Sequence, residues 1–89
     1  EPPSQEGAQL VGELVEIYIE AFGKLSEDDQ QAIMASMQYG NDHAANARVL
    51  DKPSIAAARM SIKRAREKLA NIAAFNIAVR NVERLFVGR

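Results

Sequence analysis

The residues best suited to chemistry are basic side chains in the second half of the chain. Arg59, Lys63, Arg64 and Arg66 follow one another in the stretch RMSIKRAREKL. No acidic residue occurs between Lys52 and Arg66, so these charges have no acidic neighbour in the sequence. Such a cluster can bind anions, including the phosphates of a nucleic acid. The simpler alternative is a solvated helix face, since many exposed helices carry similar charges.

The chain offers little for catalysis or metal binding. It contains no cysteine, which excludes thiolate nucleophiles, disulfides and thiolate metal sites. It contains a single histidine, His43. A metal site on a helix would need a second ligand four residues after His43, and Ala47 stands there. A Gly-rich phosphate loop and a Ser-His-acid set are also missing. We therefore expect a protein that is not an enzyme, with no cofactor, no metal and no small-molecule substrate.

Acidic and basic residues are segregated along the chain. Segment 1–47 contains nine acidic residues and one basic residue, whereas segment 48–89 contains ten basic residues and three acidic ones. The formal net charge of −1 therefore hides two halves of −8 and +7. Such segregation indicates a nucleic-acid surface or a charged partner. Alternatively, the acidic half neutralises the basic half, within one chain or across a dimer.

Apolar periodicity predicts an all-α fold of four or five helices in one domain. After a disordered tail at 1–7, we expect helices at about 8–22, 26–40 and 42–50, and a further helix from near Pro53. A chain of 89 residues buries only a modest fraction of its surface. Oligomerisation is therefore a reasonable expectation from the start.

Local signals mark where the helices begin and end. Ser26 and Asp29 have the spacing of a capping box, and Gly40 suits the residue that follows a helix. Asn41 or Asp42 can cap the third helix. Pro53 suits the first turn of the next one.

The same periodicity predicts which side chains are buried. In the first helix two adjacent apolar stripes cover a wide face, which should contact more than one neighbour: Leu10, Leu14, Ile17, Tyr18 and Ala21 in one, and Val11, Val15, Ile19 and Phe22 in the other. The expected buried residues of the second and third helices are Ile33, Met34 and Met37, and Ala44, Ala47 and Leu50. After Pro53 the seam continues through Ile55, Ala58, Ile62, Ala65 and Leu69.

A second apolar series closes the chain and predicts an interface, formed by Ile72, Phe75, Val79, Val82 and Phe86. Its spacing slips by one residue near Ile72, which indicates either one overwound helix or a separate helix at about 70–87. No Gly or Pro occurs in 55–87, which favours one long helix of about 48 Å. Such a helix would overhang the domain, and a dimer partner is the natural cover for its exposed seam.

The segment 25–69 resembles region 4 of bacterial sigma factors and the related helix-turn-helix of LuxR-type regulators. The first element is a helix that ends at Gly40. A short helix follows, with Ala47 seven residues after Gly40 and the apolar pair Val49-Leu50 at its end. A turn and a basic helix complete the order. In those families the basic helix enters DNA.

The resemblance implies a role for particular residues. Arg59, Lys63 and Arg64 would face DNA, and Arg48 and Lys52 would lie near phosphates. Arg66 belongs to the same basic helix and completes the candidate DNA-binding set. The implied function is a small cytoplasmic transcription regulator that binds DNA, RNA polymerase or both.

The alternative function is a helical protein–protein module, such as an adaptor or an inhibitor, that dimerises through its C-terminal helix. The acidic first helix and the apolar series at 72–86 support it. The sequence pI of about 5.8 favours a protein partner, because DNA-binding domains are usually basic overall. No apolar run is long enough for a membrane span, so we expect no membrane partner.

Overall fold

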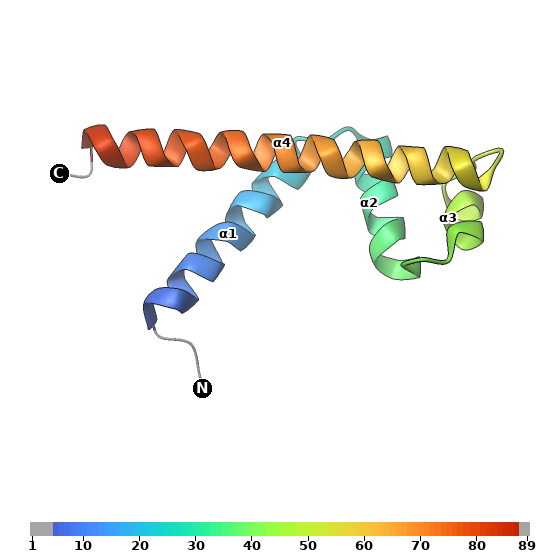
Figure 1. Cartoon of the computed structure of the whole chain (residues 1–89), viewed down its shortest axis with the longest axis horizontal. Coiled ribbons are helices and arrows are strands. Elements are labelled where there is room, and N and C mark those ends of the chain that lie inside the picture. The colour runs from blue at the N-terminus through green and yellow to red at the C-terminus, as the bar shows by residue number, and fades with distance from the viewer. Residues whose placement is uncertain (1–4, 88–89) are drawn as a thin grey trace.

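The chain folds into four helices in the computed structural model, which describes residues 5–87 (Figure 1). The helices are α1 (Gln5–Gly23), α2 (Glu27–Tyr39), α3 (His43–Val49) and α4 (Ile55–Val87). No strand occurs among the described residues, which confirms the all-α prediction. The first helix begins at Gln5, three residues before its expected start, and residues 1–4 of the expected tail lie outside the described residues.

Side-chain caps fix three of the helix starts. Ser26 Oγ accepts a hydrogen bond from the Asp29 backbone N–H at 3.2 Å, as predicted. Asp42 Oδ1 accepts from the Ala45 N–H at 3.1 Å, which settles the choice between Asn41 and Asp42. Ser54 Oγ accepts from the Ala57 N–H at 3.1 Å, so Pro53 precedes the cap and does not occupy the first turn.

α4 is one continuous helix of 33 residues, and the slip in apolar spacing does not break it. Helices α1, α2 and α3 all pack against α4. Figure 1 draws all three on the same side of α4, at successive positions along it. The molecule measures 54 × 33 × 16 Å, with a radius of gyration of 16.5 Å. A compact domain of this length has a radius of gyration of about 12 Å, so the fold is extended. None of the helices in the described part combines the length and apolar character needed to cross a membrane.

The core consists of two small clusters on either side of the middle of α4. Leu25, Ile33 and Ile62 form the larger cluster with two alanines, and Ile17 packs with Ala21 and Ala73 in the other. Among the buried apolar residues of the described part, eight are alanine and only four are larger. The small side chains permit close helix crossing, but they remove little apolar surface from water.

Two expectations about α2 are wrong. Met34 is 59% exposed and Met37 is 80% exposed, although the spacing placed both on the buried face. The helix packs instead through Ala32, Ile33, Ala35 and Ser36. The buried stripe lies to one side of the methionines, because the small residues allow a close approach to α4.

The other predicted faces are only partly buried. In α3, Ala47 is buried and Leu50 half-buried, but Ala44 is exposed, and Ala45 and Asn46 are buried in its place. In α1, Ile17 and Ala21 are buried. Both predicted stripes of α1 otherwise remain largely exposed among the residues whose side chains the structure describes, which begin at Val11.

Candidate nucleic-acid interface

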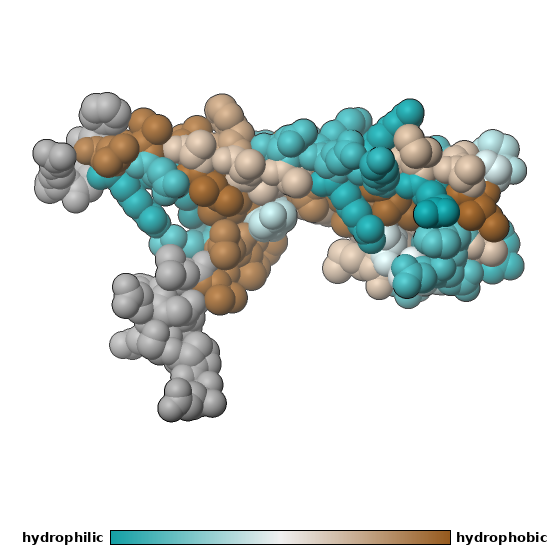
Figure 2. All heavy atoms as spheres, viewed as in Figure 1, coloured by the Kyte–Doolittle hydropathy of each residue, from teal (hydrophilic) through white to brown (hydrophobic). Residues whose placement is uncertain are grey.

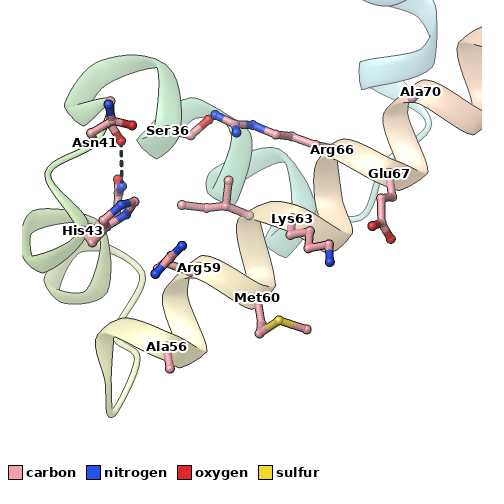
Figure 3. A pocket seen from close by; sticks show the side chains of 13 residues that line it. Ser36, Asn41, His43, Ala56, Arg59, Met60, Lys63, Arg66, Glu67 and Ala70 are labelled. Carbon is pink, nitrogen blue, oxygen red and sulfur yellow. Dashed lines mark hydrogen bonds between the residues drawn. The ribbon is translucent and has the colours of Figure 1, made fainter.

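A groove with a volume of about 700 Å³ lies between the α2–α3 corner and the N-terminal half of α4. Its α4 wall carries Arg59, Lys63 and Arg66, here called the basic row (Figure 3). The three residues are spaced by four and three positions, which puts them on one side of the helix. In Figure 3 the Arg59 and Arg66 side chains extend toward the opposite wall. Glu67 is the acidic residue among the lining side chains.

The opposite wall is polar and comes from the corner between α2 and α3. It contains Ser36, Asn41, His43 and Asn46. Asn46 is only 1% exposed, and its Nδ2 donates to the Gly40 carbonyl at 3.2 Å. This bond holds α3 against the end of α2. The wall therefore has a fixed position relative to the basic row.

Two polar atoms of this wall lack a partner. Asn46 Oδ1 and His43 Nδ1 are buried and make no hydrogen bond in the described part of the chain. An unsatisfied buried polar atom is costly. His43 is half-buried and forms part of this wall.

Gly40 and Asp51 shape the two turns that bring the walls together. Gly40 has φ 56° and its N–H donates to the Ser36 carbonyl at 2.9 Å, as expected for a residue after a helix end. Asp51 has φ 53°. The Asp51 N–H donates to the Arg48 carbonyl at 3.2 Å and the Lys52 N–H to the Ala47 carbonyl at 2.8 Å. This pattern is a Schellman motif with aspartate in the position usually taken by glycine.

The remaining predicted DNA-binding residues are exposed but lie outside the groove. Arg48, Lys52 and Arg64, here called the flanking cations, are not among the lining residues. Arg48 lies in the last turn of α3, and Lys52 lies in the turn between α3 and α4. Arg64 lies about 100° around the helix from Lys63, so it does not share the side of the basic row.

Ion pairs within the chain are confined to other basic residues. Among the described residues, Lys68 Nζ lies 3.0 Å from Asp29 Oδ2. Arg80 pairs with Glu20 at 3.6 Å, and Arg84 pairs with Glu13 at 2.7 Å. The hydrogen bond from Lys68 lowers the pKa of the Asp29 carboxyl, partial burial opposes this shift, and the Ser26 hydroxyl adds to it.

None of the six predicted DNA-binding cations takes part in these ion pairs. Acids of α1 and α2 neutralise α4 from Lys68 onward. The basic row and the flanking cations therefore form no ion pair within the described part of the chain. Neutralisation within the chain, one of the two alternatives for the charge segregation, therefore applies to α4 only from Lys68 onward.

The predicted interface residues also differ among themselves. Phe75, Val79 and Val82 are exposed by 68%, 38% and 51%. Ile72 is half-buried and packs against both buried clusters of its own chain, so it belongs to the core. The Phe86 side chain lies outside the described residues.

Sequence reasoning missed the polar wall of the groove. Asn46 and Ser36 did not stand out, because they lie among alanines and share no motif with the basic row. A usable signal is the run of polar and small residues after Gly40, where a buried asparagine can hold a helix corner. Comparison of the chain with protein-family models, with curated proteins and with solved structures finds no match.

Proposed function

We propose that this protein binds double-stranded DNA through the basic row, as a small transcription regulator. One observation carries the proposal: the three ion pairs between α4 and acids of α1 and α2 involve Lys68, Arg80 and Arg84, and none involves the row. Leaving three adjacent cations uncompensated costs self-repulsion, which an anionic partner relieves. Phosphates are such a partner, and arginine suits them through paired N–H donors.

The dimensions of the row fit a phosphate backbone. Arg59 and Arg66 are seven residues apart, which corresponds to about 10 Å along the helix. A DNA strand carries a phosphate about every 3.4 Å along its axis, so the row spans roughly three of them. Asn41 and Ser36 on the opposite wall add hydrogen-bonding groups of the kind that position DNA backbones.

The order of elements supports the same function. α3 is a short helix, the turn is tight, and α4 is longer and basic, as in the helix-turn-helix of sigma region 4. RNA polymerase is the protein partner that this resemblance implies. The flanking cations at the turn and on the adjoining side of α4 would extend the contact with phosphates beyond the groove.

A fluorescence-anisotropy titration with a duplex at low salt tests the proposal. The variant R59Q/K63Q/R66Q should bind at least tenfold more weakly than the wild type. The variant R48Q/K52Q/R64Q is the matched control, since it removes the same charge from exposed sites outside the groove. Its affinity for the duplex should fall less than that of R59Q/K63Q/R66Q. Wild-type binding no tighter than millimolar, or equal losses in the two variants, would overturn the assignment.

A further inference from the structure

Two helix faces expose large apolar side chains to solvent. The α1 face consists of Val11, Leu14, Val15, Tyr18 and Ile19, which are 44–65% exposed. The α4 face consists of Phe75, Val79, Val82 and Leu85, which are 38–68% exposed. Figure 2 shows apolar surface over both α1 and the C-terminal half of α4. Exposed apolar patches of this kind mark interaction sites.

The two faces do not cover each other within one chain. α1 contacts α4 through Ile17 and Ala21, which pack with Ala73. At about 100° per residue, Phe75 and Val82 lie about 200° and 180° around α4 from Ala73. The α4 face therefore points away from α1. No side chain of the described part of the chain covers either face.

The exposed area matches what a stable interface requires. The chain exposes 6828 Å², whereas a compact monomer of 9.8 kDa exposes about 5,200 Å². If each side chain of the two faces contributes on the order of 100 Å², together they supply about 900 Å². A standard interface buries about 800 Å² per partner.

The charges near these faces permit association with an identical chain. None of the nine face residues is ionisable apart from the phenol of Tyr18. Glu13 and Glu20 of α1 pair with Arg84 and Arg80 of α4, which reduces the local charge. A chain with a net charge of −1 repels its own copy only weakly.

We infer that a second copy of this chain covers the α1 face and the α4 face, giving a two-fold symmetric dimer. An isologous contact uses the same patch on both copies, so each copy contributes side chains of both faces. The dimer then carries two basic rows. This inference does not depend on the proposed function, because neither face contains a residue of the basic row.

Sedimentation velocity at micromolar concentration, without DNA, tests the dimer. The wild type should have twice the 9.8 kDa mass of the chain. The variants F75E and I19E should each sediment as monomers, with at least a tenfold weaker association. M37E is the matched control, because Met37 is 80% exposed on α2, outside both faces, and it should remain dimeric. A monomeric wild type, or dimeric F75E and I19E, overturns the inference.

Conservative variants keep the inference testable if a glutamate variant fails to fold. The chain contains no cysteine, so V15C and V79C each add one thiol to a face. A mixture of the two should form covalent dimers under mild oxidation. V49C is the control, because Val49 is exposed on α3 away from both faces. Cross-linking of V49C to the same extent would contradict the proposed contact.

Discussion

Lys68 Nζ lies 3.0 Å from Asp29 Oδ2, and this ion pair marks the point where α4 changes character. Before Lys68, the cations of α4 have no acidic partner among the described residues. After Lys68, Arg80 and Arg84 are paired with α1. The charge segregation of the sequence thus becomes a division along one helix, with one part available to a ligand and the other used to hold α1.

Replacing Asp29 by asparagine should change how stability depends on pH. The folded pKa of Asp29 is lowered, first by the Lys68 hydrogen bond. A lowered pKa stabilises the folded state fully above the unfolded value of 3.8, and this stabilisation is lost as pH falls through the folded pKa. Exposed pairs are worth about 0.2–1 kcal/mol, so D29N should be less stable than the wild type by about that amount at pH 7.

Thermal unfolding at pH 7 and at pH 3 measures this effect. The difference between D29N and the wild type should shrink at pH 3. K68Q should lose a similar amount of stability at pH 7. The double variant D29N/K68Q should be little less stable than either single variant. A difference that is equal at both pH values would show that the ion pair does not contribute.

Replacing Asp51 by glycine should stabilise the fold. Asp51 has φ 53°, which costs a non-glycine residue energy, and its negative charge follows the C-terminus of α3, where the helix dipole disfavours anions. Removing both effects should raise the free energy of unfolding by about 0.5–1 kcal/mol. Urea denaturation measures this change in the free energy of unfolding. D51N removes only the charge and is the control, because asparagine tolerates a positive φ as aspartate does; a gain in D51N equal to that in D51G would argue against backbone strain.

Asn46 should be more sensitive to substitution than its small size suggests. Its Nδ2 donates to the Gly40 carbonyl from a site that is 1% exposed. N46A leaves that carbonyl without its partner and should cost about 1–2 kcal/mol. N46D should cost more, because it places a buried carboxylate against the carbonyl. Urea denaturation of both variants checks the order, and N46D at least as stable as N46A would contradict the role of this bond.

Ala65 should not tolerate a larger side chain. It is fully buried in the cluster that joins α2 to α4, where close packing leaves no room for added methylenes. A65L should therefore lose about 1–3 kcal/mol in denaturant unfolding. The control is A70L, since Ala70 is exposed on the same helix. Equal stability of A65L and the wild type would show that the crossing can expand.

The helices and the cap of α2 could be predicted because they depend on neighbouring residues. Ser26 and Gly40 act within one turn of their own helix, and the local sequence specifies them. The exposure of Met34 could not be predicted in this way, because periodicity gives no weight to how closely small residues let helices approach. In α2, Ala35 and Ser36 decide the packing, and their effect depends on where α4 lies.

The groove was also beyond sequence reasoning. Its walls are separated by the α3–α4 turn, and the turn depends on Asp51 adopting φ 53°, a conformation that the residue type does not require. The basic row itself was visible as charged residues. The row lines the groove and Arg64 does not, because one side of α4 faces the α2–α3 corner. The packing of Ile62 in the core sets which side that is.

The salt dependence of duplex binding tests the central claim most directly. Each phosphate contact contributes about 0.9 to the slope of log K against log salt concentration. If the basic row binds phosphates, R59Q/K63Q/R66Q should flatten the wild-type slope by nearly three, and K68Q, which removes a cation paired with Asp29, should change it by less than one. A slope that is the same in the triple variant and the wild type would contradict the claim that these unpaired cations form the DNA-binding surface.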